Sequence, residues 1–382
     1  MKKIIYILLT FLFFHYVDAQ RAYGQFNQSA IENRIRPDSL KTGLLALNLY
    51  NFNYVRNYEY FGLFQDGYTL YGTQLEPQLV YYAHPNLALV AGAYIRKDFG
   101  KSGIYDAKPL FSMKYQKKDL RLIFGSLEGN IHHRYIEPLY DFERKISTPI
   151  EYGTQLVLEK ERLFLDAWIA WQKMIYPAST EKEEIVGGLS TETVLSDQDG
   201  WKLSIPAQFM AYHQGGQIDL LKDKPLTTLA NAAAGFKIHK TYDSPFLKVL
   251  FTDNYIAGFK DFSPTKQLPY QQGYGLWLNA GASTRAGTLM LSYWAGNRFI
   301  SIKGMPLYQS VSKTVFDKGF TENKRNILMI RYAWQKELLP NLYLDIRLEP
   351  HLDLSHSGTN KIEFSNSFFL TYKEDIRLFK VK

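Results

Sequence analysis

Cysteine is absent from the 382 residues of this sequence, which excludes acylation as a lipoprotein. After residue 20 no apolar run approaches the roughly 18 residues of a transmembrane helix, and the mean hydropathy is −0.25. A helical membrane protein is therefore excluded. The net charge is +8, but lysine and arginine form no cluster with interleaved aromatic residues, so a nucleic-acid partner is not expected.

The N-terminal residues have the pattern of a secretory signal peptide. Two lysines follow the initial methionine, residues 4–14 are apolar, and Val17 and Ala19 suit positions −3 and −1 of a cleavage site. An N-terminal anchor helix is the alternative, but the apolar run is too short to span a bilayer, which takes about 20 residues. We therefore expect residues 1–19 to be a cleaved signal peptide.

The most regular stretch of the chain runs from residue 342 to residue 354. Its even-numbered positions are apolar, whereas the odd-numbered ones carry Tyr343, Asp345, Arg347, Glu349, His351 and Asp353. Side chains alternate between the two faces of a strand, so one face is apolar and the other is charged. Soluble strands usually run about 5 to 6 residues, whereas a tilted membrane-spanning strand needs about 9 to 11. The stretch has the length of a membrane-spanning strand.

Alternating segments of this kind recur through the whole chain. They lie near residues 42–56, 68–82, 87–97, 107–116, 119–127, 149–160, 162–174, 184–195, 201–213, 226–239, 245–256, 271–283, 287–299, 323–335, 341–354 and 360–372. Short connections alternate with long ones, as the tight periplasmic turns and longer outer loops of an outer-membrane barrel do. A β-propeller would instead repeat a shared motif about every 40 to 50 residues, and the sequence has no such repeat.

With its signal peptide, its roughly sixteen alternating strands and its short and long loops, the chain resembles bacterial outer-membrane β-barrel proteins of the porin kind. The resemblance is architectural and covers residues 42–372, and the segment Asp18-Ala19-Gln20 resembles cleavage regions common in Bacteroidota. It implies an all-β, up-and-down antiparallel barrel over residues 42–382 in the outer membrane. Residues 20–41 would be a periplasmic segment that either tethers the barrel or partly plugs it.

A barrel of about sixteen strands is wide enough for an aqueous channel unless a loop or plug fills it. The alternation places a set of charged and aromatic side chains on the inner face. We expect the lining residues to be Arg96, Lys114, Asp166, Trp168, Trp294, Arg298, Arg331, Asp345, Arg347, Glu349, His351 and Asp353. In the alternative, charges of both signs pair across neighbouring strands and brace the wall, rather than orient solutes in a transverse field.

The third outer connection, residues 128–148, resembles the third loop of general porins in place and length, and that loop folds into the lumen. The expected constriction residues are His132, His133, Arg134, Glu137, Asp141 and Glu143. An exposed surface loop is the alternative. The adjacent histidines are poor candidates for a metal site, because neighbouring residues do not easily share one metal without further partners. No metal and no cofactor are expected.

Two candidate catalytic patterns are unconvincing. Ser355, His356 and Ser357 are adjacent, and adjacent residues of a strand face opposite sides, so the imidazole would not reach either hydroxyl. His351 and Asp353 share a face but lie in a charge-rich wall. The sequence therefore predicts that the protein is not an enzyme.

The function that this reading predicts is passive diffusion of small hydrophilic solutes through the barrel. The alternative is a non-conducting barrel that serves as a subunit or scaffold of an outer-membrane export, assembly or surface-attachment complex. The expected partners are outer-membrane lipid and lipopolysaccharide, small hydrophilic solutes, and further copies of the chain or other membrane proteins.

Overall fold

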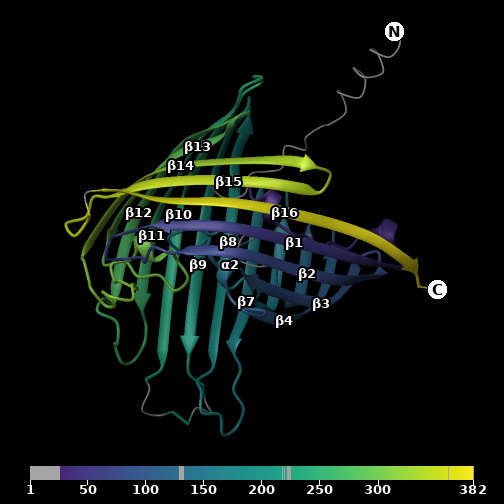
Figure 1. The fold of residues 1–382 in the computed structure, drawn as a ribbon, viewed down its shortest axis with the longest axis horizontal. Helices are drawn as coiled ribbons and strands as arrows, with labels where there is room; N and C mark the ends of the chain where they lie inside the picture. Colours follow the sequence, from purple (N-terminus) through teal and green to yellow (C-terminus); the bar gives the residue numbers. More distant parts are fainter. Residues whose placement is uncertain are drawn as a thin grey trace.

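Sixteen antiparallel strands close into one barrel in the computed structural model (Figure 1). The structure describes residues 26–128, 133–216, 218, 220, 221, 225–359 and 361–381. The strands are β1 (Leu44–Glu59), β2 (Thr69–His84), β3 (Leu87–Asp98), β4 (Asp106–Lys117), β5 (Leu120–Ser126), β6 (Tyr152–Glu159), β7 (Leu163–Lys173), β8 (Glu184–Gln198), β9 (Trp201–Gln214), β10 (Thr227–Thr241), β11 (Leu247–Asp261), β12 (Gln272–Thr284), β13 (Gly287–Asn297), β14 (Lys324–Leu339), β15 (Leu342–Asp353) and β16 (Ile362–Lys380). Each strand pairs with its neighbours in sequence, and β1 also pairs with β16, so the predicted up-and-down barrel is confirmed.

The described helical turns are short. They are η1 (Ser29–Ile31), η2 (Ser39–Lys41), α2 (Arg144–Ser147) and η3 (Pro306–Tyr308). In the described ranges no helix has the length and apolar character needed to cross a membrane.

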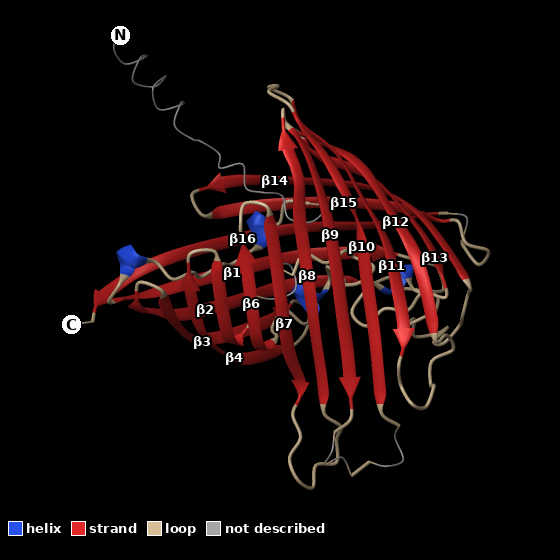
Figure 2. Cartoon of the chain, turned by 180° about the vertical axis from the view of Figure 1, so that it is seen from behind, coloured by secondary structure: helices blue, strands red, loops and turns tan. Residues whose placement is uncertain are grey.

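The strands of opposite walls run in different directions. In Figure 2 the long strands β7–β11 cross the direction of β14–β16 steeply. Closure of a barrel requires its strands to tilt, so strands on the near and far walls cross in projection. Short turns gather at the periplasmic end, and the longer loops gather at the other end, outside the cell.

β15 keeps the alternation that its sequence predicts. The side chains of Asp345, Arg347 and Glu349 are buried inside the barrel, whereas Ile346 and Leu348 are partly exposed on the outer face. Lipid solvates the apolar side chains, and the enclosed interior takes the charged ones.

β1 departs from this pattern because its inner face is aromatic. Phe52 and Tyr54 are buried, and the Phe52 ring lies 5.2 Å from that of Phe369 on β16, measured between centroids. Asn51 and Asn53 occupy the outer face, where their side-chain amides are hydrogen-bonded to each other. The interior is therefore not polar throughout, and one part of it is a packed aromatic core.

Two outer loops fold into the barrel, namely the described part of the β5–β6 loop (residues 127, 128 and 133–151) and the β13–β14 loop (residues 298–323). A parallel β-bridge joins them between Tyr140 and Lys303. Leu139 of one loop and Leu307 of the other lie in one buried cluster with Trp277 of the wall. The third outer connection thus enters the lumen, as its resemblance to porin loops implies.

The segment before β1 also lies inside the barrel. Ile31 and Ile35 are buried, and the hydroxyl of Tyr50 donates to the carbonyl oxygen of Ile31 at 2.7 Å. Arg347 of β15 donates to the side chain of Gln28 at 2.8 Å. Residues 26–35 therefore occupy part of the barrel interior. The predicted signal peptide, residues 1–19, lies outside the described residues and stays a prediction.

The two-faced wall makes a prediction about depth in the bilayer. Ile346→Arg puts a charge on the lipid face near the middle of β15, and we expect it to destabilise the barrel by about 2–4 kcal/mol. Leu342→Arg places the same charge at the periplasmic end, where the expected cost is about 0–1 kcal/mol. Urea unfolding of the protein in lipid vesicles measures both variants. Equal costs at the two positions would contradict the assignment of this face to lipid.

Candidate functional site

Most of the expected lining residues lie on the inner wall. Eleven of the twelve are at most 9% exposed. These are Arg96, Lys114, Asp166, Trp168, Trp294, Arg331, Asp345, Arg347, Glu349, His351 and Asp353. Their role in lining a path for solutes stays a proposal, because the loops that cover them determine whether a path exists.

Arg298 is the exception, and its predicted placement on the inner wall is wrong. β13 ends at Asn297, and Arg298 follows in the left-handed backbone region, with φ of 50°. Its side chain is exposed, and its Nε donates to the amide oxygen of Asn323 at 3.1 Å. Because β13 ends at Asn297, the alternation of side chains between its two faces does not extend to Arg298.

Many inner-wall charges are paired with a neighbour of opposite sign. The Nε of Arg96 lies 2.7 Å from Asp98, and that of Arg347 lies 2.9 Å from Asp345. In each pair the partners are two residues apart on one strand, so they share the inner face. The alternative that the sequence left open has charges paired across neighbouring strands, and these two pairs instead lie within one strand; Arg331 of β14 and Glu349 of β15 form a pair across strands.

A larger ion network joins the β5–β6 loop to the wall. Arg331 of β14 bonds Glu349 of β15 through Nε at 2.7 Å and Glu137 of the loop through Nη1 at 3.0 Å. Arg56 of β1 also lies 3.4 Å from Glu349. The hydroxyl of Tyr308, in the β13–β14 loop, donates to Glu137 at 2.9 Å. Both inner loops are thereby held by one buried carboxylate.

His133 forms a second attachment of the same loop. Its Nδ1 lies 2.9 Å from Asp166 of β7, its Nε2 lies 3.3 Å from Glu151, and its ring stacks on Trp168 at 4.4 Å. Burial alone would lower the pKa of His133, but Asp166 and Glu151 outweigh it and raise the pKa to about 9. At neutral pH the ring is an imidazolium that bridges two carboxylates. The residue is therefore an anchor of the loop.

The other expected constriction residues have separate partners. Arg134 bonds Glu159 of β6 at 2.9 Å, and the hydroxyl of Tyr68 donates to Glu143 at 2.5 Å. Burial, followed by the nearby Glu143, raises the pKa of Asp141 to about 7. His132 lies outside the described residues. The structure brings Glu137 and His133 into buried networks. The partners of these two residues lie on distant strands, so the spacing of residues in the sequence does not predict them.

A histidine and a carboxylate face each other at the outer rim, on the inner side of β15 and β16. The Nε2 of His351 lies 3.2 Å from Oε2 of Glu363, directly across the two strands. We call these two residues the rim pair. Tyr60 covers the imidazole edge-on, with ring centroids 4.8 Å apart, and the backbone amide of Phe61 donates to Glu363 at 3.2 Å. Sequence reasoning missed Glu363, because its position opposite His351 depends on strand register.

The serines beside His356 have structural partners instead. The hydroxyl of Ser355 accepts from Arg325 at 3.0 Å, and Ser357 bonds Glu322. His356 itself is exposed. Across the part of the chain that the structure describes, no three His, Cys, Asp or Glu side chains form a group suited to a metal ion.

The His133 anchor predicts a loss of stability at alkaline pH. The folded pKa of about 9 lies above the ordinary 6.5, so the stabilisation is complete below pH 6.5 and is lost as pH rises through 9. It amounts to no more than about 3.5 kcal/mol at about 1.4 kcal/mol per pKa unit. Urea unfolding at pH 7 and at pH 10 measures this loss as a fall in the free energy of unfolding. In His133→Gln that free energy should fall much less between the two pH values. An equal change in both proteins would contradict the anchor.

The fold resembles solved outer-membrane proteins. OprD of Pseudomonas aeruginosa aligns with a TM-score of 0.51 and 12% identity, over 90% of this chain and 100% of that one. A loop-deleted OmpT of Vibrio cholerae aligns with a TM-score of 0.52 and 10% identity, over 87% of this chain and 100% of the other. At such low identity the likeness shows the fold alone. No curated protein sequence matches the chain.

A family model described as "Lipid A 3'-O-deacylase-type" matches residues 35–381, a range that includes all sixteen strands. The family is named for an enzyme activity, so the prediction that the protein is not an enzyme is wrong. The sequence analysis failed to indicate this because it found no convincing local catalytic motif. Since the match spans most of the sequence, the chain belongs to the lipid A 3'-O-deacylase-type family.

Proposed function

We propose that the protein hydrolyses an acyl ester of lipid A at the outer face of the outer membrane. The observation that carries the proposal is the family match over the whole barrel. The described geometry supplies a candidate for the chemistry in the rim pair, His351 and Glu363. Both side chains lie near the outer ends of their strands, the level at which the outer leaflet meets the barrel.

The rim pair suits a general base. A neutral His351 can take a proton from a water molecule that attacks the ester carbonyl, and Glu363 stabilises the imidazolium that results. A bond forms between the water oxygen and the carbonyl carbon, and the bond to the sugar oxygen breaks. His351 returns the proton to that oxygen, which leaves a free fatty acid and a sugar hydroxyl. Tyr60 covers the ring in this structure, so the substrate reaches it only when the loop after β1 moves.

The surface around the rim pair suits a lipid. Exposed apolar side chains lie on the β1–β2, β13–β14 and β15–β16 loops and on the ends of nearby strands, the elements at the same end of the barrel. They are Phe61, Phe316, Phe320, Leu354 and Ile362. Lys318, Lys324 and Lys361 are exposed on the same elements. Apolar groups beside ammonium groups match acyl chains beside phosphates.

The proposed activity predicts a change in lipid A. When the protein is produced in a Gram-negative host, we expect mass spectrometry to show lipid A that lacks one ester-linked acyl chain. His351→Gln should lower the yield of this product by about 100-fold or more, because it removes the base. Glu363→Gln should lower it less, because the imidazole remains.

A matched histidine variant controls for folding. His239 of β10 also pairs with an acid, Asp253, at 2.6 Å, but it lies on another wall, so His239→Gln should keep full activity. Each variant is checked for the shift in gel mobility that marks a folded barrel. Intact lipid A in cells that contain the folded wild-type protein would overturn the proposal.

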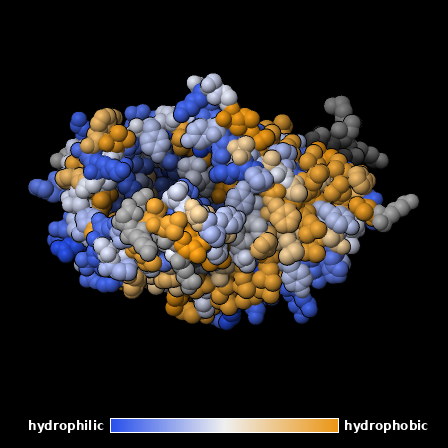
Figure 3. All heavy atoms as spheres, turned by 90° about the horizontal axis from the view of Figure 1, so that it is seen from below, coloured by the Kyte–Doolittle hydropathy of each residue, from blue (hydrophilic) through white to orange (hydrophobic). Residues whose placement is uncertain are grey.

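A second candidate function is a channel for small hydrophilic solutes. The specific observation is a hollow in the surface on the side of the outer loops, surrounded by hydrophilic side chains (Figure 3). Charges of both signs on the inner wall and a loop folded inward support this candidate. The two candidate functions share His351, which belongs both to the expected channel lining and to the rim pair.

A planar bilayer tests the channel directly. The wild-type protein should give stepwise conductance, and replacing residues 134–147 by a short glycine-serine linker should enlarge it. Glu137→Gln, which weakens the bond from the loop to Arg331, should make large openings more frequent. A bilayer that stays silent with folded wild-type protein and with both variants would remove this candidate.

A further inference from the structure

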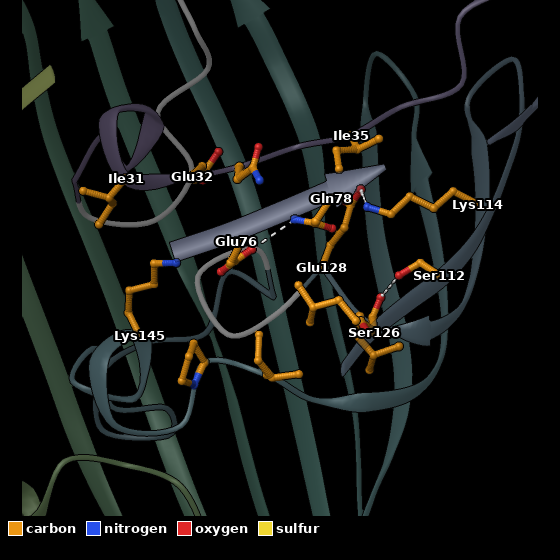
Figure 4. A pocket seen from close by; sticks show the side chains of 15 residues that line it. Ile31, Glu32, Ile35, Glu76, Gln78, Ser112, Lys114, Ser126, Glu128 and Lys145 are labelled. Atoms are coloured by element: carbon orange, nitrogen blue, oxygen red, sulfur yellow. Dashed lines mark hydrogen bonds and ion pairs between the residues drawn. The ribbon is translucent and has the colours of Figure 1, made fainter. Parts of the chain in front are cut away.

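A small cavity lies inside the barrel, away from the rim pair (Figure 4). It measures about 80 Å³ and lies between the segment before β1, the inner faces of β2, β4 and β5, and the β5–β6 loop. A single water needs roughly 10–15 Å³ of such space. The cavity therefore holds a few waters or one solute of a few heavy atoms. We call it the side cavity.

Two opposite charges line the side cavity without pairing with each other. Glu76 of β2 and Lys145 of the β5–β6 loop are each 9% exposed. Among the described contacts, the Glu76 carboxylate accepts only from Nε2 of Gln78, at 3.2 Å. The Lys145 ammonium lies over the rings of Tyr50 and Phe52, at 4.8 and 5.3 Å from their centroids, and no described carboxylate lies within 4 Å of it.

The remaining charges at the cavity behave differently. Lys114 and Glu128 lie 3.7 Å apart and form an ion pair across it, and Glu32, which also lines the cavity, lies 3.0 Å from Arg34. Elsewhere in the barrel Arg331 is bonded to Glu349. A buried charge without a partner costs several kcal/mol, which is why buried charges are usually paired. Glu76 and Lys145 therefore differ from these paired charges.

The side chain of Gln74 ties the two elements that carry Glu76 and Lys145 to each other. Nε2 of Gln74 donates to the carbonyl oxygens of Lys145 and Ile146, at 3.2 and 2.9 Å, which holds the loop against β2. Glu76 is two residues from Gln74 on the same inner face. The ammonium and the carboxylate are thus presented to the cavity by elements that are tied together, so the site is formed before any ligand arrives.

We propose that the side cavity binds a small zwitterion, of the size of a simple amino acid such as glycine. The ligand's ammonium would bond Glu76, and its carboxylate would bond Lys145. Only a molecule that carries both charges close together satisfies both groups, and the volume excludes a long side chain. This inference does not rest on the proposed deacylation.

Equilibrium dialysis of the detergent-solubilised full chain against radiolabelled glycine tests the inference. We expect saturable binding at one site per chain, with acetate and methylammonium each at least tenfold weaker as competitors. Glu76→Gln and Lys145→Met should each weaken glycine binding at least tenfold. Glu59→Gln and Lys248→Met, which alter the same residue types far from the cavity, should leave it unchanged.

Three results would overturn the inference. They are no glycine binding by the folded wild-type protein, binding that survives both cavity variants, and acetate competing as well as glycine. The first would mean that the cavity holds water only. Lipid A deacylation by the same preparations is measured in parallel, so a failure of the cavity is distinguished from a failure of the rim pair.

Discussion

The pairing of β1 with β16 is the constraint on which the rest of the structure depends. No water is available within a bilayer to bond the backbone, so each amide and carbonyl of a spanning strand must find a partner in another strand. The two strands meet along their whole length, from Leu44 opposite Lys380 to Glu59 opposite Phe364. Closure at sixteen strands leaves an interior that wall side chains alone do not fill. The inward loops and the segment before β1 occupy that space.

Filling the interior with loops brings charged groups into a setting that excludes most water. These charges are stabilised by networks in which one carboxylate bonds several partners, as Glu137 bonds Arg331 and Tyr308. Removing one member of such a network leaves a buried charge, so these contacts specify a single position for each loop more than they add net stability. The two sites for which we propose functions lie outside these networks, namely the covered rim pair and the two separated charges of the side cavity.

The alternation of side chains predicted the barrel, the strand number and the inner face of β15, because lipid and lumen impose a period of two on each strand. It failed where a local feature broke the period. Arg298 follows the end of β13, and β1 turns aromatic residues inward. The site was less predictable. Glu363 opposes His351 only through strand register, and Lys145 meets the Glu76 cavity only because a loop more than sixty residues further along the chain folds inward. One sequence shows neither relation.

The segment before β1 has a consequence for the order of assembly. Its residues bond side chains that are made last: Gln28 meets Arg347, and the carbonyl of Ser29 meets Lys373, 319 and 344 residues further along the chain. Residues 28 and 29 therefore cannot take up their final positions until the last strands are in place. These residues are synthesised before the strands and dock after them, so their docking marks the closure of the barrel.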